Sequence, residues 1–241
     1  MPKIGMVINE RVCGVGFLTD KKRIELKIYG GIATVNCYLL KVDSGFILID
    51  IGPSSKRNSL EDELEKEGCK VGDLNLIIIT HGDSDHTGNA AYFRQKYGAP
   101  IALHPDDEGM VQTGNMSHNR KVNLLVRILF ALPFIKLKKS DRFKGDIDVY
   151  DGFDLGDYGL NARIIHIPGH SKGSIGIITA DGDFYCGDIF SNTDKPVLNS
   201  IMDDLDAAHS SIRKLEKLDI NMVYPGHGDP FPMKKFQKTM Q

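Results

Sequence analysis

Short segments of alternating or continuous apolar residues fill the first third of the chain, and they predict the strands of a β-sheet. Residues 23–30 (RIELKIYG) alternate between apolar and polar side chains, as a half-buried strand does. The apolar segments 34–42 and 46–52 flank the turn sequence DSG, which predicts a hairpin. Residues 74–80 (LNLIIIT) form a continuous apolar run, which is typical of a strand buried on both faces.

Helical and strand patterns alternate along the rest of the chain. Residues 59–68 begin with Ser, carry Glu in the first turn and end at Gly, which together predict a capped helix. Further helices are expected at residues 89–98 and 206–218, and further strands at 100–104, 162–169, 174–182 and 184–190. The strand–helix–strand order in both halves predicts two packed sheets with helices outside, built by a single domain over residues 1–241.

A helical insertion is expected at about residues 105–145, where the strand pattern stops. Its apolar part, residues 122–137, is shorter than a membrane span and is interrupted by Arg127 and Pro133. Three interpretations remain open: the insertion packs its own helices over the sheets, forms a hydrophobic lid over a pocket, or contacts lipid. The basic residues that would help a lipid contact are Arg120, Lys121, Lys136, Lys138 and Lys139.

Charge and cysteine usage narrow the class of protein. The 241 residues include 30 Lys and Arg against 32 Asp and Glu, for a formal net charge of -2. This balance produces no long-range field that attracts a polyanion, so nucleic acid is not an expected partner. The 4 cysteines lack CxxC spacing and lie in or beside apolar runs, and the first residues do not resemble a signal peptide. We therefore expect reduced thiols and a cytoplasmic protein.

Histidines and aspartates gather at the ends of the expected strands. Asp50 ends one apolar run, and the sequence THGDSDHTGN at residues 80–89 follows another. His170, Asp188 and His227 each follow a later strand, in the sequences PGH, CGD and PGH. Because strand ends present loops to one edge of a sheet, these side chains converge if the strands are neighbours.

Such convergence implies a bound cation. Asp83, Asp85 and Asp188 in one pocket would repel one another, which would raise their pKa values. A divalent ion removes that conflict. Imidazole and carboxylate ligands suit zinc, iron or manganese, and the lack of a thiolate in the cluster disfavours a closed structural zinc site.

The order of these motifs resembles the metallo-β-lactamase superfamily, in which an Asp closes an early strand and HxHxDH, a later His, a bridging Asp and a final His follow. The five equivalents here are Asp50, THGDSDHTG, PGHSKGS, CGDIF and YPGHG. The resemblance runs through nearly the whole chain and implies an α/β (α+β) protein, a four-layer αββα sandwich with a dinuclear metal site at one edge. It assigns one metal ion to His81, Asp83 and His170 and the other to Asp85, His86 and His227, with Asp188 bridging.

Asp83 departs from the family pattern, which has histidine at this position. Each metal ion would then receive two imidazoles, one terminal carboxylate and a share of Asp188, so the two sites become chemically alike. Three carboxylates leave less residual positive charge on two divalent ions, which predicts a weaker Lewis acid and more tolerance of iron or manganese. Flavodiiron proteins resemble this arrangement, with glutamate at the same position, so Asp83 is expected to remain a ligand. The sequence also leaves open the alternative that only one of the two metal ions is bound.

The resemblance implies a hydrolase in which a hydroxide that bridges two divalent ions attacks a carbonyl or phosphoryl centre. Asp85 would orient the water or accept its proton, and Asp50 would hold a ligand histidine in the correct tautomer. Our leading hypothesis is a cytoplasmic enzyme that cleaves a small ester, thioester or lactone, with zinc as the first choice of metal. The alternatives are a di-iron redox protein related to the flavodiiron core and a low-turnover metal-binding sensor. Insertions commonly shape the pocket in this superfamily, which favours a lid over a membrane contact.

Overall fold

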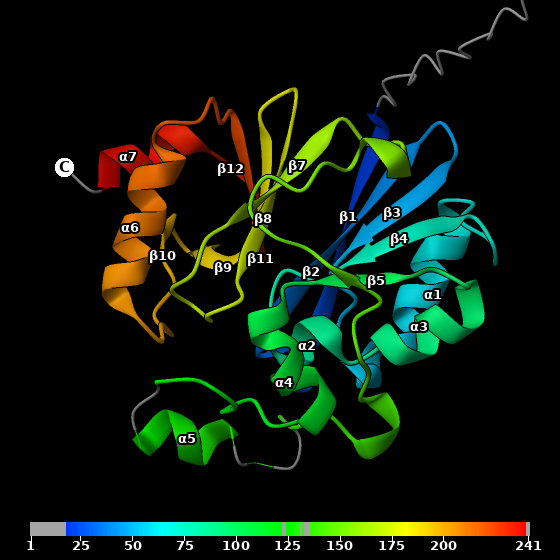
Figure 1. Ribbon diagram of the computed structural model, residues 1–241, viewed down its shortest axis with the longest axis horizontal. Helices are drawn as coiled ribbons and strands as arrows, with labels where there is room; N and C mark the ends of the chain where they lie inside the picture. Colours follow the sequence, from blue (N-terminus) through cyan, green and yellow to red (C-terminus); the bar gives the residue numbers. More distant parts are fainter. Residues whose placement is uncertain (1–17, 122–123, 131, 133–134, 240–241) are drawn as a thin grey trace, which may run out of the picture.

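Two facing β-sheets with helices on their outer sides make up the computed structural model, which describes residues 18–121, 124–130, 132 and 135–239 (Figure 1). Helices α1 (Arg57–Lys66) and α3 (Ala90–Tyr97) cover the outer side of one sheet. Helices α6 (Leu205–Leu215) and α7 (Met233–Thr239) cover the outer side of the other. This is the αββα sandwich expected from the sequence.

The first sheet contains six strands that are neighbours in chain order. They are β1 (Leu18–Ile28), β2 (Ala33–Val42), β3 (Gly45–Ile49), β4 (Leu74–Ile78), β5 (Ile101–Leu103) and β6 (Ile147–Asp148). Strands β1, β2 and β3 pair antiparallel, as the predicted hairpin requires, whereas β3 to β6 pair in parallel. Because β3, β4 and β5 are parallel, their carboxyl ends lie at the same edge of the sheet.

The second sheet has the strand order β12-β11-β9-β8-β7, with β10 paired to β9. Its strands are β7 (Ala162–His166), β8 (Ile175–Thr179), β9 (Asp183–Asn192), β10 (Val197–Leu198), β11 (Met222–Gly228) and β12 (Phe231–Pro232). Strand β11 runs parallel to β9, and both reach the edge at which β3 and β4 end. The expected strands at 162–169, 174–182 and 184–190 are confirmed, with β9 extending past Asp188.

Alternation along the strands divides the apolar core into three layers. Leu40 and Ile47 of the first sheet pack with Ile164 and Ile177 of the second sheet between the two sheets. The opposite faces of the sheets pack against the helices, for example Leu48 of β3 with Leu60 of α1. Cysteines 37, 69 and 186 are buried free thiols, as expected, whereas Cys13 lies outside the described residues.

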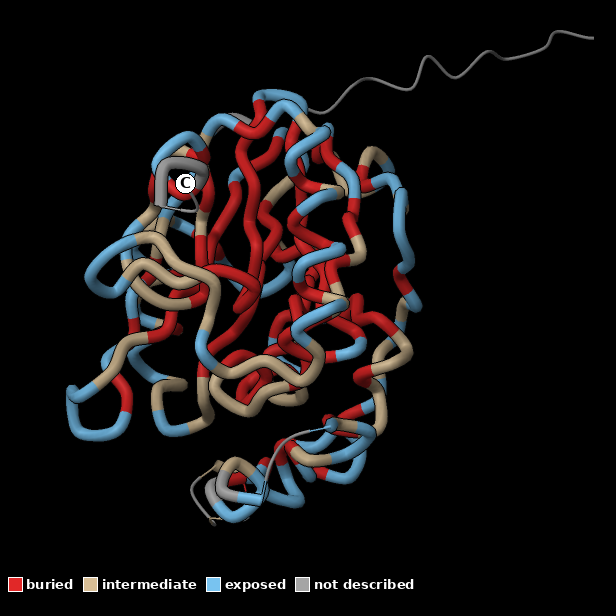
Figure 2. The backbone as a smooth tube through the Cα atoms, turned by 90° about the vertical axis from the view of Figure 1, so that its left-hand side faces the viewer, coloured by how far each residue is buried: buried red, intermediate tan, exposed pale blue. Residues whose placement is uncertain are grey.

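The segment between β5 and β6 extends from the sandwich at the edge where the two sheets present their loops (Figure 1). It contains α4 (Pro105–Thr113), α5 (Leu124–Phe130) and the 3-10 turn η3 (Lys139–Asp141), and most of its other described residues have no regular structure. Much of its backbone is exposed or half-buried (Figure 2). Part of the predicted apolar stretch, residues 122–123, 131 and 133–134, lies outside the described residues.

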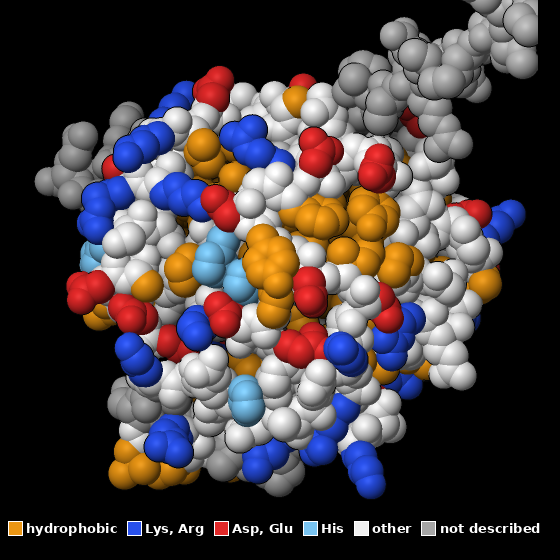
Figure 3. Space-filling view, viewed as in Figure 1, with side chains coloured by type: hydrophobic (Ala, Val, Ile, Leu, Met, Phe, Trp, Pro, Cys, Tyr) orange, Lys and Arg blue, Asp and Glu red, His pale blue; other side chains and the backbone are white. Residues whose placement is uncertain are grey.

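Helix α5 exposes hydrophobic side chains at the lower edge of the molecule (Figure 3). Leu124 is 75% exposed and Ile128 is 57% exposed. No helix in the described part of the chain is both long enough and apolar enough to span a bilayer. Across the rest of the face in Figure 3, basic and acidic side chains are interspersed, as the balanced composition predicts.

Candidate metal centre

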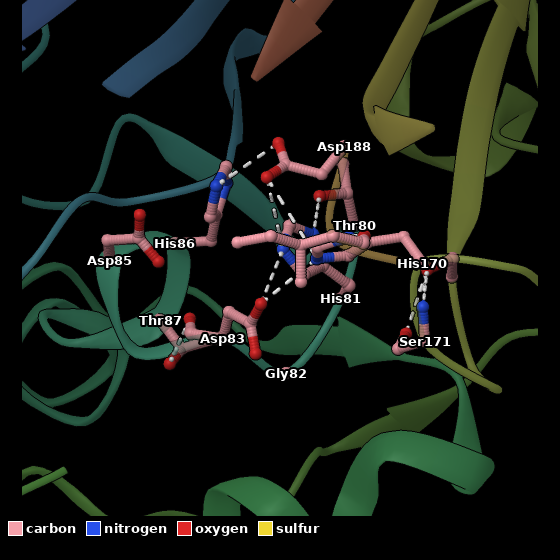
Figure 4. A network of polar contacts seen from close by, with 12 residues as sticks. Thr80, His81, Gly82, Asp83, Asp85, His86, Thr87, His170, Ser171 and Asp188 are labelled. Carbon is pink, nitrogen blue, oxygen red and sulfur yellow. Dashed lines mark hydrogen bonds and ion pairs between the residues drawn. The ribbon is translucent and has the colours of Figure 1, made fainter. Parts of the chain in front are cut away.

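All eight residues singled out in the sequence converge at one edge of the sandwich (Figure 4). Asp50 follows β3, and His81 follows β4, whose continuous apolar run leads directly into the THGDSDH sequence. Asp83 immediately precedes the short helix α2 (Ser84–Thr87), which carries Asp85 and His86. The second sheet contributes His170 from the β7–β8 turn, Asp188 from within β9 and His227 from the end of β11.

A glycine allows β9 to approach β4 closely enough for this convergence. Gly187 has a φ of 50°, and a Cβ atom at this position would lie 2.6 Å from Thr80 Oγ1. Glycine adopts such positive φ values without a steric penalty. Asp188 is therefore delivered from inside β9, as the strand expected at residues 184–190 implies, and not from a loop after the strand.

The ligand atoms form two triads. One triad is His81, Asp83 and His170, and the other is Asp85, His86 and His227; within each, the candidate ligand atoms all lie within 4.8 Å of one another. Asp83 Oδ2 is 3.0 Å from His170 Nε2 and 3.6 Å from His81 Nε2. Asp85 Oδ2 is 3.6 Å from His227 Nε2. These are the two sets of residues that the family resemblance assigns to one metal ion each, and the assignment stays a prediction.

Asp188 lies between the two triads (Figure 4). Its Oδ2 atom is 3.1 Å from His227 Nε2 in one triad and 3.9 Å from His170 Nε2 in the other. Its Oδ1 atom is 3.4 Å from His86 Nε2. Oδ2 thus lies near both triads and Oδ1 near the triad of His86 and His227, which places this carboxylate to bridge two metal ions.

Each of the four histidines is oriented by an acceptor at Nδ1, which leaves Nε2 directed into the site. His170 Nδ1 lies 2.7 Å from the Ile201 carbonyl, and His227 Nδ1 lies 2.5 Å from the Thr34 carbonyl. The other two histidines are held through Asp50 and Thr80, as described next. Such outer contacts fix the tautomer and ring orientation of metal-ligating histidines.

Asp50 is the hub of these orienting contacts. Its Oδ2 atom lies 2.8 Å from His86 Nδ1 and accepts from Thr80 Oγ1 at 2.7 Å, and its Oδ1 atom accepts from the Thr80 main-chain N–H at 2.8 Å. Thr80 Oγ1 in turn lies 2.9 Å from His81 Nδ1. Asp50 therefore contacts one histidine of each triad, His86 directly and His81 through Thr80, and its role in fixing their tautomers stays a prediction.

We expect Asp50→Asn to lower the affinity for metal by about 10- to 100-fold, the usual effect of losing such an outer carboxylate. An amide oxygen is a weaker acceptor than a carboxylate, and an amide cannot accept from Thr80 and His86 at both of its atoms. Competition for zinc with a chromophoric chelator measures the effect. The exposed Asp43→Asn is the matched control, and equal affinities of the two variants would contradict the assigned role.

Carboxylates and imidazoles lie close together in a buried setting, and they shift one another's pKa values. Burial by itself lowers the pKa of His227, but the neighbouring Asp188 carboxylate raises it to about 9. Burial lowers the pKa of His81, next to His86 and His170. Burial raises the pKa of Asp85. Carboxylates and imidazoles packed at this density favour either shared protons or divalent cations.

Two buried polar atoms at the centre lack a hydrogen-bond partner within the described part of the chain, namely His81 Nε2 and Asp188 Oδ1. Buried polar groups in proteins are nearly always paired, so each unpaired atom requires an explanation. A nitrogen lone pair and a carboxylate oxygen that face the same space are the donor atoms of a metal site. The residues present therefore fit the metal ions that the family resemblance implies.

Arg120 was missed as a site residue by the sequence, which placed it among surface basic residues that could contact lipid. Its side chain is only 1% exposed, and its Nη1 atom donates to Asp83 Oδ1 at 2.5 Å. Burial alone would raise the pKa of Asp83, but Arg120 and His170 hold this pKa well below its usual range. The lipid-contact interpretation is therefore wrong for Arg120, whose buried charge is paired with the Asp83 carboxylate.

Asp107 of α4 is a second residue that the sequence did not single out. Its carboxylate is buried and accepts from Gly82 N at 2.9 Å, Gly173 N at 2.8 Å and Ser171 Oγ at 2.6 Å. Gly82 lies between His81 and Asp83, and Ser171 follows His170. Asp107 thus joins the loops that carry all three members of one triad.

A third group of possible ligands, His104, Asp106 and His166, lies outside the main site. The rings of His104 and His166 are stacked, with 4.2 Å between centroids and 5° between planes. An imidazole lone pair lies in the plane of its ring, so two parallel stacked rings cannot direct lone pairs at one ion. We interpret the pair as a packing contact and not as a pair of metal ligands.

This stacked pair has a consequence for stability. Burial, followed by the effect of His166, lowers the pKa of His104 to about 4. The unfolded chain takes up a proton at His104 near pH 6.5, whereas the folded protein does so only near pH 4, so acid favours unfolding across this window. His104→Phe keeps the stacking and removes the proton, so it should remove up to about 3 kcal/mol of acid destabilisation.

Urea unfolding of the metal-free protein and of His104→Phe, between about pH 7 and pH 4, measures this difference. The variant is expected to lose less stability on acidification, even if its stability near neutral pH is lower. Parallel stability curves for the two proteins would contradict the assignment.

A cavity of about 610 Å³ opens beside the two triads. The metal-facing side is formed by Asp83, Asp85, His170, Asp188 and His227, and the apolar side includes Ile28, Met116, Phe130, Ile135 and Ile201. Met116, Phe130 and Ile135 belong to the insertion, so the insertion supplies an apolar wall, as a lid would. An adjoining cavity of about 550 Å³ shares Tyr29, Ser84 and Asp85 with the first and includes Lys136 and Lys138.

Comparisons of sequence place this chain among metallo-hydrolases. A family model described as the metallo-beta-lactamase superfamily matches residues 30–227. A probable metallo-hydrolase of Methanocaldococcus jannaschii is 31% identical over 214 residues, which cover 85% of this chain and 92% of that protein. The hydroxyacylglutathione hydrolase GloC of Haemophilus influenzae is 31% identical over 212 residues, which cover 80% of this chain and 85% of that protein.

Comparisons of structure agree on the fold. TTHA1623, solved in a di-iron-bound form, has a TM-score of 0.67 at 21% identity, covering 88% of this chain and 95% of that chain. The B3 metallo-beta-lactamase BLEG-1 has a TM-score of 0.66 at 21% identity, covering 90% of this chain and 95% of that chain. The αββα sandwich, the family match over most of the chain and the order of the motifs agree, and the chain belongs to the metallo-β-lactamase superfamily of metal-dependent hydrolases.

Proposed function

We propose that this chain is a hydrolase that uses two divalent metal ions, zinc in the first instance, to cleave a small ester, thioester or lactone. The observation that carries this proposal is the pair of unpaired buried atoms, His81 Nε2 and Asp188 Oδ1, at the centre of two ligand triads that face a cavity. His81, Asp83 and His170 would hold one ion, and Asp85, His86 and His227 the other, with Asp188 shared.

Metal ions bound there would supply activated water and an electrophile for a carbonyl oxygen. The chain itself orients the histidine rings and lines one side of the cavity with apolar side chains. Asp50 and Thr80 fix the rings of His81 and His86, and the apolar side of the cavity surrounds a substrate with Met116 and Phe130. Asp85 lines the cavity with its carboxylate near His227, where it can accept a proton from the attacking water.

The cavity supports a small acyl substrate. A volume of about 610 Å³ is within the range of small-molecule sites, and its wall is largely hydrophobic. The relative from Haemophilus influenzae is named a hydroxyacylglutathione hydrolase, and we therefore propose thioesters as the first substrates to test. Lys136 and Lys138 in the adjoining cavity provide positive charge for a substrate with an anionic group. We propose a cytoplasmic setting, in keeping with the three buried free thiols.

A panel of esters, thioesters, lactones and phosphodiesters, assayed with zinc, manganese and iron supplied separately, tests this function. Each thioester should be present in a neutral and a carboxylated form. We expect metal-dependent hydrolysis that is fastest with a thioester, ester or lactone. Turnover restricted to phosphodiesters, or none with any metal, would contradict the proposal.

A di-iron redox function is the second candidate, because TTHA1623 was solved in a di-iron-bound form and Asp83 adds a hard oxygen ligand. Protein purified without added zinc distinguishes the two candidates. Iron with a visible spectrum that changes on reduction would support the redox function. A colourless zinc or manganese pair that hydrolyses esters would support the hydrolase.

A further inference from the structure

Arg120 is the charged group of this site that the family's ligand pattern does not explain. It lies in the insertion, in the loop after α4, and its side chain is 1% exposed. A buried guanidinium requires partners for its charge and its N–H groups, because an unpaired buried charge is strongly unfavourable. The partners of Arg120 therefore indicate its role.

The guanidinium joins three segments of the chain. Nη1 donates to Asp83 Oδ1 at 2.5 Å, and Nη2 donates to the His170 main-chain carbonyl at 2.8 Å. Nε lies 2.8 Å from each carboxylate oxygen of Asp203. The Phe130 ring of α5 lies against the guanidinium, with 4.8 Å to its centroid. Asp203 and Phe130 hold the planar group in place, and its remaining edge fixes Asp83 relative to His170.

The two carboxylate oxygens of Asp83 have different surroundings as a result. Oδ1 is occupied by Arg120, whereas Oδ2 faces His170 Nε2 at 3.0 Å and His81 Nε2 at 3.6 Å. Asp83 can then offer a metal ion only one oxygen, as a histidine offers only one nitrogen. The positive charge of Arg120 offsets the negative charge that a carboxylate adds in place of a neutral imidazole.

We propose that Asp83 and Arg120 act as one unit that replaces a histidine ligand. Arg120 positions the Asp83 carboxylate and compensates its negative charge. This inference rests on the proposed function. Removal of Arg120 alone frees both oxygens of Asp83 and leaves its charge uncompensated. Replacement of Asp83 alone by histidine leaves a buried guanidinium beside a metal ion. Each change by itself is harmful, but the two together restore a neutral ligand without an opposing charge.

A double-mutant cycle on the full chain tests this unit, with zinc stoichiometry and affinity measured by competition with a chromophoric chelator. We expect Arg120→Met and Asp83→His each to weaken one of two zinc sites by about 10- to 100-fold, the range found for outer contacts of metal ligands. The zinc affinity of the double variant should lie within about threefold of that of the unchanged protein, because Arg120→Met raises the affinity when position 83 is histidine. Since Asp203 loses its partner in Arg120→Met, the cycle is repeated with Asp203→Asn in every protein.

The sign of the Arg120→Met effect separates this role from simple structural support. A structural arginine would lower zinc affinity to the same extent with either residue at position 83, and that additive result would overturn the inference. Unfolding of the metal-free variants shows whether each one folds. If Arg120→Met does not fold, Arg120→Gln takes its place, because it removes the charge but keeps a polar side chain, and it too must become beneficial when position 83 is histidine.

Failure of the proposed function has a different signature. If the unchanged protein does not bind two equivalents of zinc or another divalent ion, the metal centre itself is wrong. If it binds them and the cycle is additive, only the unit formed by Asp83 and Arg120 is wrong.

Discussion

Replacement of Asp188 by alanine should remove tight metal binding and lower hydrolysis by on the order of 10³-fold. Asp188 contacts both triads, at 3.1 Å from His227 Nε2 and 3.9 Å from His170 Nε2, so its loss affects both metal ions at once. The remaining histidines keep their orienting contacts but lack the carboxylate that neutralises part of the charge of each ion. Metal content after dialysis, together with the rate for the best substrate of the panel, measures the effect.

His86→Ala is the companion variant, and His209→Ala is its control. His86 belongs to one triad only, so we expect the His86→Ala protein to lose about one of its two metal ions and about half of its activity. His209 is exposed on α6 and belongs to neither triad, so its replacement should change neither quantity. Unchanged metal content in both Asp188→Ala and His86→Ala would overturn the whole assignment of the site.

The positions of several candidate ligands were predictable because they come at or directly after the ends of strands. A continuous apolar run such as residues 74–80 identifies β4 without any knowledge of tertiary structure, and His81 comes directly after it. Parallel pairing of β3 with β4 and of β9 with β11 then brings Asp50, His81 and His227 to one edge. Most of the fold, and the residues of both triads, could thus be predicted from the strand pattern and from the order of the histidines and aspartates.

The residues that support the ligands were not predictable in this way. Arg120 is 37 positions from Asp83 and lies in a segment of irregular structure, so no period in the sequence links the two. Asp107 lies in the first turn of α4 beside Asp106, where an acidic residue is expected for its favourable interaction with the helix dipole alone. Only the path of the insertion, which sequence periodicity does not determine, directs these side chains toward the metal centre.

Arg120, which the sequence analysis did not count as part of the site, also changes the expected chemistry of the metal ions. Counting only Asp83, Asp85 and Asp188 predicts two ions with little residual charge and a weak Lewis acid. The guanidinium at 2.5 Å from Asp83 Oδ1 reduces the negative charge that this ligand delivers. We therefore expect metal preference closer to that of a site with histidine at position 83 than the ligand count alone suggests, which favours zinc in the proposed function.

Asp107→Ala should cost about 3 kcal/mol of folding stability in the metal-free protein, the largest effect on stability that we expect from a single change near this site. The carboxylate accepts three hydrogen bonds, from Gly82 N, Gly173 N and Ser171 Oγ, and it is 1% exposed. Its removal leaves the buried N–H groups of Gly82 and Gly173 without an acceptor, and each unpaired group carries a desolvation penalty, whereas Ser171 Oγ keeps Ser174 Oγ at 2.8 Å. Relief of the buried charge itself, which raises the pKa of Asp107, offsets part of that cost.

Urea unfolding measures this loss, and the neighbouring Asp106→Ala is the matched control. The Asp106 side chain is 36% exposed and its contact with Lys172 spans 3.4 Å, so its removal should change stability by less than about 1 kcal/mol. Because Asp107 joins the loops of His81, Asp83 and His170, its replacement should also weaken zinc binding even where the chain remains folded. An Asp107→Ala protein as stable as Asp106→Ala, with full zinc affinity, would show that the two loops hold their positions without this carboxylate.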